Sequence, residues 1–444
     1  MSETWRNLSA ADLGRGIDTG AICPVALTEC FLDAIDAHPL TPRIYASTMR
    51  GQAEDIAMAA RKRARMGLRR GPLDGVPVSW KDLFDTAGVA TEAGSAVLKG
   101  RVPVQNATVV DRLTGAGLPP LGKTHMTELA YSGLGLNPVT QSAPCIHDPD
   151  RVSGGSSSGA ATSVAWGLAP LGIGSDTGGS VRIPAVWNDL VGLKTTAGRV
   201  PLTGVVPLAA KFDTVGPLTR TVEDAALAFA LLADCPAPDL RGATLSGTRM
   251  LILETVATEG LREVPAKGFD HAVGRLSKAG VHIEHGTIPA VAEAMDLAGV
   301  LFGSQCYGAW GPLLEANAEL VFPPVLDRFR GGKVFSGAEY VSAWDRLDAL
   351  RAQYLAQTAG YDAVILPTSP CTPPLIQDLL DDHAYFASEN LLTLRNTRIG
   401  NLMGLCALTL PTGIPMTGLM MMAAPHQEAR LLRLGAAAEA ALSS

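Results

Sequence analysis

Short apolar runs alternate with helix-length amphipathic stretches along the second half of the chain. Residues 250–253 and 363–366 form continuous apolar runs, a pattern typical of strands buried on both faces of a sheet, and Val281-His282-Ile283 is also expected to be a strand. Residues 264–279 and 337–358 instead repeat apolar side chains at helical spacing. The apolar residues that repeat in the longer helix are Val341, Trp344, Leu347, Leu350 and Tyr354. The alternation predicts an α/β fold with a central mixed β-sheet flanked by helices, and active sites of such folds lie outside strand ends.

The N-terminal segment, about residues 1–70, has the helical pattern throughout. Ser9 can cap a short first helix, Pro24 suits the first turn of a second, and a third is expected at about 46–66. The third helix ends in the basic cluster RKRARMGLRR, residues 61–70. Because lysine and arginine near a helix C-terminus complement the helix dipole, we interpret this cluster as a solvated face rather than a nucleic-acid site.

Composition and charge limit the class of protein. Of the 444 residues 47% are apolar and 18% are charged, which assures a sizeable hydrophobic core. The formal net charge of −7 gives no electrostatic reason to expect a nucleic-acid or anionic membrane partner. No segment has roughly 18 uninterrupted apolar residues, and the first residues lack a basic start followed by an apolar core. We therefore expect a cytoplasmic protein with no membrane association.

Cysteine and histidine patterns give no sign of a metal site. The seven cysteines are scattered without a CxxC pair, so reduced thiols are expected rather than a disulfide framework or structural zinc. None of the eight histidines forms an HxxxH or HExxH pattern. His125 and His147 could each be imagined as a catalytic base, but we interpret both as structural because a better candidate base exists.

Candidate chemistry concentrates in residues 151–184. Glycine and serine form two clusters, at residues 154–159 and 175–180, with one helix-length apolar segment between them. If that segment folds as a helix on the sheet, the serines of both clusters can lie at the same end of one layer. The turn from Asp176 to Ser180 offers consecutive backbone N–H groups that can be aimed at an oxyanion. A serine that ends such a turn is placed to attack, but it needs a base to remove its proton.

Lys81 is the best candidate for that base. The apolar run of residues 75–80 ends on Lys81, which puts the amine at a strand end among apolar neighbours. Burial favours the neutral amine, and lowering a lysine pKa by ~3 units toward neutrality costs ~4 kcal/mol. Serine and lysine pairs are an established alternative to serine and histidine. A neutral Lys81 could therefore act as the base.

Several long motifs in order resemble the amidase signature family of serine hydrolases. The motifs are GVPVSWKDLFDTAG, RVSGGSSSGAA, GSDTGGSVRIPA, VGLKTTAGRVP and FDTVGPLTRTVEDAA, with weaker similarity in YDAVILPTSPCTPP and NLMGLCALTLPTGIPMTG. The signature core covers about residues 72–226. The resemblance implies one amidase domain over residues 1–444, with the mixed-sheet amidase signature fold.

The resemblance also implies a Ser-cisSer-Lys triad. Matched motif by motif, Ser180 is the nucleophile, Ser156 the bridging serine and Lys81 the base. It implies a cis peptide bond between Gly155 and Ser156. The implied oxyanion hole is made by the backbone amides of Thr177, Gly178, Gly179 and Ser180.

The activity implied by the resemblance is hydrolysis of a small-molecule carboxamide to a carboxylate and ammonia or an amine, through an acyl-enzyme and without a cofactor. Family resemblance places the loop at about 129–132 near the acyl site, so Tyr131 and Ser132 are candidate substrate-binding residues, as is Trp187. Family members are often homodimers, so a homodimer is a further expectation. The chain departs from the usual family pattern at residues 186–189, at Thr195 and at Ala160.

Three alternatives use other features of the sequence. The glutamine-hydrolysing subunit of an aminoacyl-tRNA amidotransferase belongs to the same family and would explain the basic cluster, but the stretch LLTLRNTRIGN lacks that subunit's usual acidic residue. Residues 117–124 match the P-loop pattern GxxxxGK[ST], but Pro119 and Pro120 remove two of the donors that a phosphate would need. Residues 155–159 match GxSxG, the nucleophile-elbow pattern of α/β-hydrolases, with Ser157 as the nucleophile. That elbow follows a buried strand, and no strand is evident before Ser157.

Overall fold

Eleven strands form one mixed sheet in the computed structural model, which describes residues 2–443. The order across the sheet is β1-β3-β2-β4-β6-β5-β10-β11-β9-β7-β8. The strands are β1 Tyr45–Thr48, β2 Val78–Lys81, β3 Pro120–Thr124, β4 Gly172–Asp176, β5 Val191–Lys194, β6 Thr214–Thr219, β7 Arg249–Leu253, β8 His282–Gly286, β9 Ala363–Pro367, β10 Cys406–Pro411 and β11 Gly418–Ala423. The predicted α/β class with a central mixed sheet flanked by helices is confirmed.

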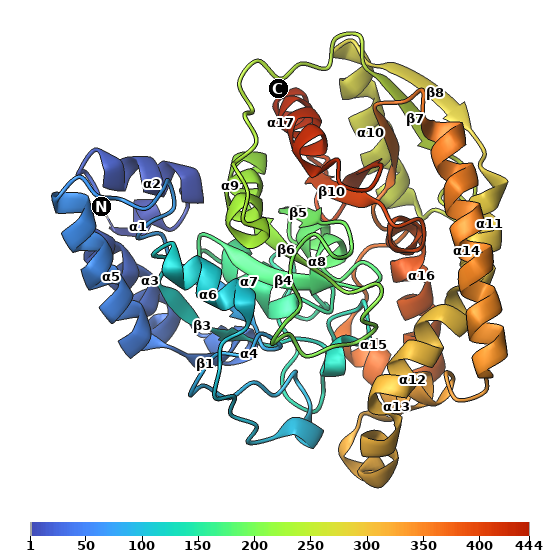
Figure 1. Cartoon of the computed structure of the whole chain (residues 1–444), viewed down its shortest axis with the longest axis horizontal. Coiled ribbons are helices and arrows are strands. Elements are labelled where there is room, and N and C mark those ends of the chain that lie inside the picture. The colour runs from blue at the N-terminus through green and yellow to red at the C-terminus, as the bar shows by residue number, and fades with distance from the viewer. Residues whose placement is uncertain (1, 444) are drawn as a thin grey trace.

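Helices surround this sheet (Figure 1). In chain order they are α1 Ser2–Trp5, α2 Ala10–Asp18, α3 Pro24–Ala37, α4 Thr41–Ile44, α5 Arg50–Arg65, α6 Thr108–Gly115, α7 Ser158–Ala165, α8 Arg182–Trp187, α9 Val222–Ala233, α10 Glu263–Lys278, α11 Pro289–Asp296, α12 Ala298–Ala316, α13 Pro323–Arg330, α14 Gly337–Thr358, α15 Ile376–Asp381, α16 His383–Leu402 and α17 Glu428–Ser443. Three short 3₁₀ helices in the described residues are η1 Ala96–Leu98, η2 Glu128–Ala130 and η3 Ala318–Leu320.

Two sets of helices pack on the strands at the centre of the sheet. Helices α9, α17 and α10 contact one another in turn and pack on β6, β10 and β11, whereas α7 and α8 pack on β4, β5 and β10. The N-terminal helices α1–α5 gather at the end of the sheet formed by β1 and β3, and α11–α14 lie at the opposite side of the molecule (Figure 1). No helix within residues 2–443 is long and apolar enough to span a bilayer.

Parallel pairing places two strand ends of the candidate site side by side. Strand β2 pairs in parallel with β4, so the C-terminal ends of both, at Lys81 and Asp176, lie at the same edge of the sheet. The helix between them, α7, lies close against β4 because Gly172 and Gly174 have no side chain. A Cβ at Gly172 would come within 2.5 Å of Ala160 O, and one at Gly174 within 2.5 Å of Ser157 Oγ. The N-terminus of α7 is thereby held at that same edge.

Most of the predicted elements are observed. Ser9 accepts a hydrogen bond from the N–H of Asp12 and caps α2, and Pro24 begins α3. The predicted helices at 264–279 and 337–358 correspond to α10 and α14, and the three predicted strands to β7, β8 and β9.

Two predictions about helical positions are wrong. The helix expected at about 46–66 begins only at Arg50, because residues 45–48 form the edge strand β1 and pair antiparallel with β3. Val341 of α14 does not belong to the apolar face, since its side chain is 59% exposed.

Candidate active site

Lys81 ends β2 and is fully buried. Its Nζ donates hydrogen bonds to Ser156 Oγ at 2.7 Å and to Ser175 Oγ at 2.8 Å. Burial lowers the pKa of Lys81 from 10.5 to about 7, although the nearby carboxylates of Asp176 and Asp213 oppose that shift. Near neutral pH a large share of this amine is therefore neutral and able to accept a proton.

Ser156 directly precedes the N-terminus of α7, and Ser180 lies between β4 and α8. The peptide bond between Gly155 and Ser156 is cis, as the sequence resemblance implies. Ser157 donates its backbone N–H to the carbonyl oxygen of Ser180 at 3.2 Å, which joins the two serine-bearing segments. Ser180 is 4% exposed and lines a cavity, and no described residue forms a hydrogen bond with its Oγ.

The turn after β4 lies against the cavity that Ser180 lines. Thr177, Gly178 and Ser180 all line this cavity. Gly179 does not line it, and its N–H donates a hydrogen bond to Asp176 Oδ1 at 2.9 Å. Of the four residues whose amides are expected to form an oxyanion hole, three line the cavity, whereas the expectation for Gly179 is corrected because its N–H is bonded to Asp176.

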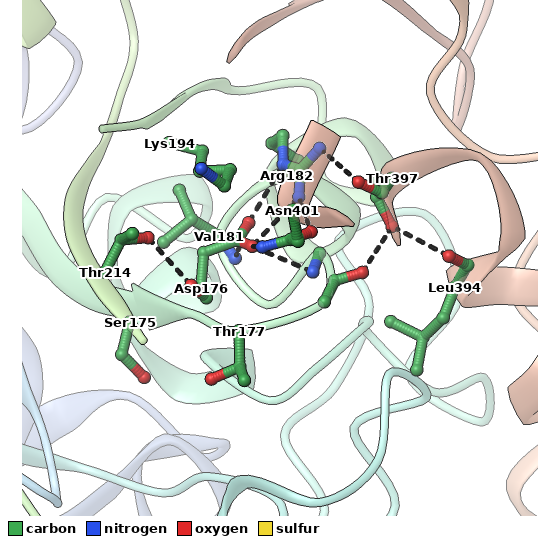
Figure 2. Close-up of polar contacts among 12 residues, drawn as sticks. Ser175, Asp176, Thr177, Val181, Arg182, Lys194, Thr214, Leu394, Thr397 and Asn401 are labelled. Atoms are coloured by element: carbon green, nitrogen blue, oxygen red, sulfur yellow. Dashed lines mark hydrogen bonds and ion pairs between the residues drawn. The ribbon is translucent and has the colours of Figure 1, made fainter. Parts of the chain in front are cut away.

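Asp176 holds this turn from inside the protein. Its carboxylate accepts hydrogen bonds from the backbone N–H groups of Gly179 and Val181, from the guanidinium of Arg182, and from Asn401 Nδ2 (Figure 2). Burial alone would raise the pKa of Asp176, but the Arg182 charge and hydrogen bonds outweigh burial and hold that pKa well below its usual range. The turn is thus fixed by a carboxylate that stays ionised.

Helix α16 supports the same turn from the other side. Thr397 Oγ1 donates to the carbonyl oxygen of Gly178 at 2.7 Å, and Arg182 Nη1 donates to the carbonyl oxygen of Thr397 at 2.7 Å (Figure 2). Gly179 has φ +140°, and a Cβ there would lie 2.1 Å from Thr397 Oγ1. Glycine is therefore required at this position for the turn to approach α16.

The cavity has a volume of about 330 Å³, near the lower end of the range for small-molecule sites. Thr177, Gly178 and Ser180 form part of its lining, and much of the rest is apolar. Other lining residues are Tyr131, Ser132, Leu208, Phe302, Cys306, Arg328, Phe335, Leu391, Leu394 and Arg398. The space beside Ser180 therefore suits a small molecule.

The structure brings two of the three predicted substrate-binding residues to this cavity. Tyr131 and Ser132 line it, and Ser132 Oγ donates a hydrogen bond to Asn390 Oδ1 at 3.2 Å. Trp187 does not line it. Its indole is completely buried and its Nε1 donates to the carbonyl oxygen of Cys371 at 3.2 Å. The expectation for Trp187 is corrected, because α8 turns this side chain into the core.

The alternative bases and the P-loop match have structural explanations. His125 does not line the cavity and burial lowers its pKa to about 4, while His147 Nε2 lies 2.8 Å from Asp189 Oδ2. Residues 120–124 form β3, and the buried Lys123 donates to the carbonyl oxygen of Phe84 at 2.8 Å. A strand whose lysine is engaged in the core does not have the geometry of a phosphate-binding loop.

Comparison with known proteins identifies the family. The amidase family model matches residues 26–432. The chain is 36% identical to the 2-amino-5-chloromuconic acid deaminase of Comamonas testosteroni, over 88% of this chain and 86% of that protein. It is 34% identical to a glutamyl-tRNA(Gln) amidotransferase subunit of Anaeromyxobacter dehalogenans, over 97% and 96% of the two chains. The chain belongs to the amidase signature family. It is therefore a hydrolase that cleaves amide bonds.

A solved structure agrees with this assignment. The peptide amidase of Stenotrophomonas maltophilia superimposes on this amidase with a TM-score of 0.83 at 26% identity, covering 99% of this chain and 97% of that one. The correspondence extends along nearly the whole of both chains. The sheet and the helices described above are thus the amidase signature fold.

Sequence reasoning missed several residues of the site. Asp176 and Arg182 both lie inside the recognised motif GSDTGGSVRIPA, so their six-residue spacing was a usable signal for an ion pair across the turn. Arg328 and Arg398 lie 70 residues apart on α13 and α16, and no local pattern marks them. Only the folded chain brings these two arginines to the cavity of the amidase.

Proposed function

We propose that this amidase hydrolyses a carboxamide through an acyl-enzyme on Ser180, with Ser156 and Lys81 completing a Ser-cisSer-Lys triad. The observation that carries the proposal is the buried Lys81 amine, hydrogen-bonded to Ser156 Oγ and held at a pKa of about 7. A base poised near the working pH combines the right protonation state with a useful driving force for proton transfer.

In the first step Ser180 attacks the carbonyl carbon. Lys81 keeps one N–H on Ser175 Oγ and accepts the proton of Ser156 with its lone pair, while Ser156 accepts the proton of Ser180. Ser180 Oγ has no hydrogen-bond partner among the described residues of the free enzyme, and catalytic hydrogen bonds commonly tighten only once substrate is bound. The developing oxyanion accepts hydrogen bonds from the backbone N–H groups of Thr177, Gly178 and Ser180.

In the second step the C–N bond breaks. The proton held by Lys81 returns through Ser156 to the leaving nitrogen, since an amide anion is a poor leaving group. Water then attacks the acyl carbon and passes a proton through Ser156 to Lys81, and that proton returns through Ser156 to Ser180 Oγ as the acyl–oxygen bond breaks and the carboxylate leaves. Carbamates and esters carry similarly polarised acyl carbons, so the same nucleophile could attack them.

Ammonia release tests this proposal. The panel contains aliphatic, aromatic and dicarboxylic amides and glutamine, assayed with wild type, Lys81→Ala and Ser180→Ala. We expect release by wild type from at least one small amide and loss of release in both variants. Intact-mass analysis adds a second readout, because the acyl group should appear on wild type. An acyl adduct that still forms at the active site of Ser180→Ala would contradict the assigned nucleophile.

The alternative function is that of a glutamine-hydrolysing subunit, and relatives named for their place in a glutamyl-tRNA(Gln) amidotransferase support it. That subunit would require partner proteins and tRNA. Glutaminase activity that appears or rises only when partner chains are added would favour it over a free-standing amidase. Activity of the isolated chain on other amides, unchanged by partner chains, would rule it out.

Tyr131→Ala should change the size preference of the cavity. The Tyr131 ring packs against Phe329 with ring centroids 4.5 Å apart, so its loss widens the wall of the cavity. We expect the kcat/KM of a bulky aromatic amide to rise by about tenfold relative to a small aliphatic amide. The control is Tyr361→Ala, because Tyr361 lies at the surface with its hydroxyl on Glu284. An equal loss for both amides would contradict a role in substrate choice.

A further inference from the structure

Two arginines line the same cavity as Ser180. Arg328 comes from α13 and Arg398 from α16. They are the only charged side chains among the described residues that line this cavity, and the lining includes no aspartate or glutamate. The reacting serine therefore shares its cavity with two positive charges and no negative one.

Neither guanidinium is neutralised by the protein. Arg328 Nη1 donates to the carbonyl oxygen of Tyr131 at 2.8 Å, and its Cζ lies 4.2 Å from the centre of the Tyr131 ring. Arg398 forms no hydrogen bond or ion pair with any residue from 2 to 443. Burial and the neighbouring Arg328 charge lower the pKa of Arg398 to about 10, so it still carries a proton at neutral pH.

Nearby acidic residues are engaged elsewhere. Glu389, on the same helix as Arg398, forms an ion pair with Arg262. Glu315 forms an ion pair with Arg330, which lies on α13 with Arg328, at 2.8 Å. The protein thus pairs the arginines beside the cavity and leaves unpaired the two that line it.

Two like charges brought together without a counter-ion are unfavourable for the folded state, and a bound anion relieves that cost. The planar guanidinium group matches a carboxylate particularly well, with two parallel N–H···O bonds. We infer that Arg328 and Arg398 bind a carboxylate of the substrate, so that the amidase acts on small amides that carry a carboxylate, such as monoamides of dicarboxylic acids. This inference rests on the proposed hydrolysis at Ser180.

The same charges discriminate against substrates with an ammonium group. A free amino acid such as glutamine carries a carboxylate and an ammonium on adjacent atoms. Because no carboxylate of the described residues lines the cavity, that ammonium would approach two arginines without a partner. The relative from Comamonas testosteroni is named for an acid as its substrate, which agrees with an anionic substrate class.

The test compares glutaramic acid with glutaramide, which has nearly the same shape but no charge, and with glutamine. Initial rates of ammonia release are measured for wild type, Arg328→Met, Arg398→Met and the control Arg330→Met. Succinamic and adipamic acids, each beside its diamide, cover other chain lengths. Arg330 is suited as the control because it lies on α13 but pairs with Glu315 outside the cavity.

We expect wild type to prefer a monoamide over its diamide by about tenfold or more in kcat/KM, and to prefer it over glutamine. Arg398→Met and Arg328→Met should each reduce the monoamide-to-diamide preference by about 10- to 100-fold, mainly through KM, because each removes a charge-assisted hydrogen bond. Arg330→Met should keep the wild-type preference. Equal rates on monoamides and diamides by wild type would overturn the inference while leaving the amidase function intact.

A binding measurement separates failure of the inference from failure of the proposed function. Glutarate is titrated calorimetrically into wild type and into Arg398→Met. Binding to wild type that is at least about tenfold weaker in Arg398→Met supports the carboxylate site, even if no amide in the panel is hydrolysed. If glutarate binds both proteins equally, or binds neither, the carboxylate site is wrong.

Discussion

Lys81→Met is expected to lower kcat by about 10⁴-fold or more, as much as Ser180→Ala. In the proposed relay Lys81 accepts the proton that passes from Ser180 through Ser156. No histidine lines the cavity in the described part of the chain, so no second base is at hand to replace it. Groups that act as one unit are strongly non-additive, and the double variant should therefore be no slower than either single variant. A double variant slower by the product of both losses would contradict the relay.

The pH profile gives an independent check on the same residue. With the pKa of Lys81 at about 7, the free enzyme is active above that value, where the amine is neutral, and inactive below it. The kcat/KM of wild type should therefore rise with pH through about 7 and then level off. A flat profile across this region would argue against Lys81 as the base.

Lys81→Met should also retain its fold, which separates loss of chemistry from loss of structure. The pKa of Lys81 is depressed in the folded state, so its protonated form disfavours folding below pH about 7, and this penalty is relieved as pH rises towards the unfolded value of 10.5. Methionine removes the penalty. At acidic pH the thermal midpoint of Lys81→Met should be at least equal to that of wild type.

The parts of the fold that could be predicted are those with a strong local pattern. Helix α14 was predicted with its observed bounds because Leu347, Leu350 and Tyr354 repeat on one buried face. Strand β1 was missed because it is a four-residue edge strand in which two of four side chains are exposed, so its pattern does not stand out from the helix that follows.

In the candidate site, too, the residues that lie in a local motif could be predicted and those placed by tertiary packing could not. Lys81 and Ser156 could be found because each lies in a long motif, and the fold joins them by one direct hydrogen bond. The Gly179 N–H donates to the Asp176 carboxylate only because the turn folds back towards Asp176. The order of residues in the sequence does not specify that fold. The direction of Trp187 depends on how α8 packs, and Arg398 reaches the cavity only through tertiary packing.

Arg182→Met is expected to lower the free energy of unfolding by about 3–5 kcal/mol, the largest stability loss we predict. Arg182 and Asp176 are both completely buried and form an ion pair at 2.9 Å. Methionine leaves the Asp176 carboxylate buried without its counter-ion, and it removes the donor to the carbonyl oxygen of Thr397. Because Asp176 also fixes the turn of the proposed oxyanion hole, kcat should fall as well.

Urea unfolding of Arg182→Met and Arg241→Met compares the stability lost with a buried ion pair and with an exposed one. Arg241 pairs with Asp239 at the same distance of 2.9 Å, but its side chain is 91% exposed, so its loss should leave the unfolding midpoint almost unchanged. The pKa of Asp176 is held low in the folded state, so its contribution to stability is present above the unfolded pKa of about 3.9 and is lost only as pH falls below that value. The stability gap between wild type and Arg182→Met should be largest near neutral pH and should narrow as pH falls towards the unfolded pKa. Burial raises the pKa of the Asp176 carboxyl once Arg182 is gone, and protonation then relieves the cost in the variant. If Arg182→Met were as stable as Arg241→Met, the buried pair would not be what holds the catalytic turn.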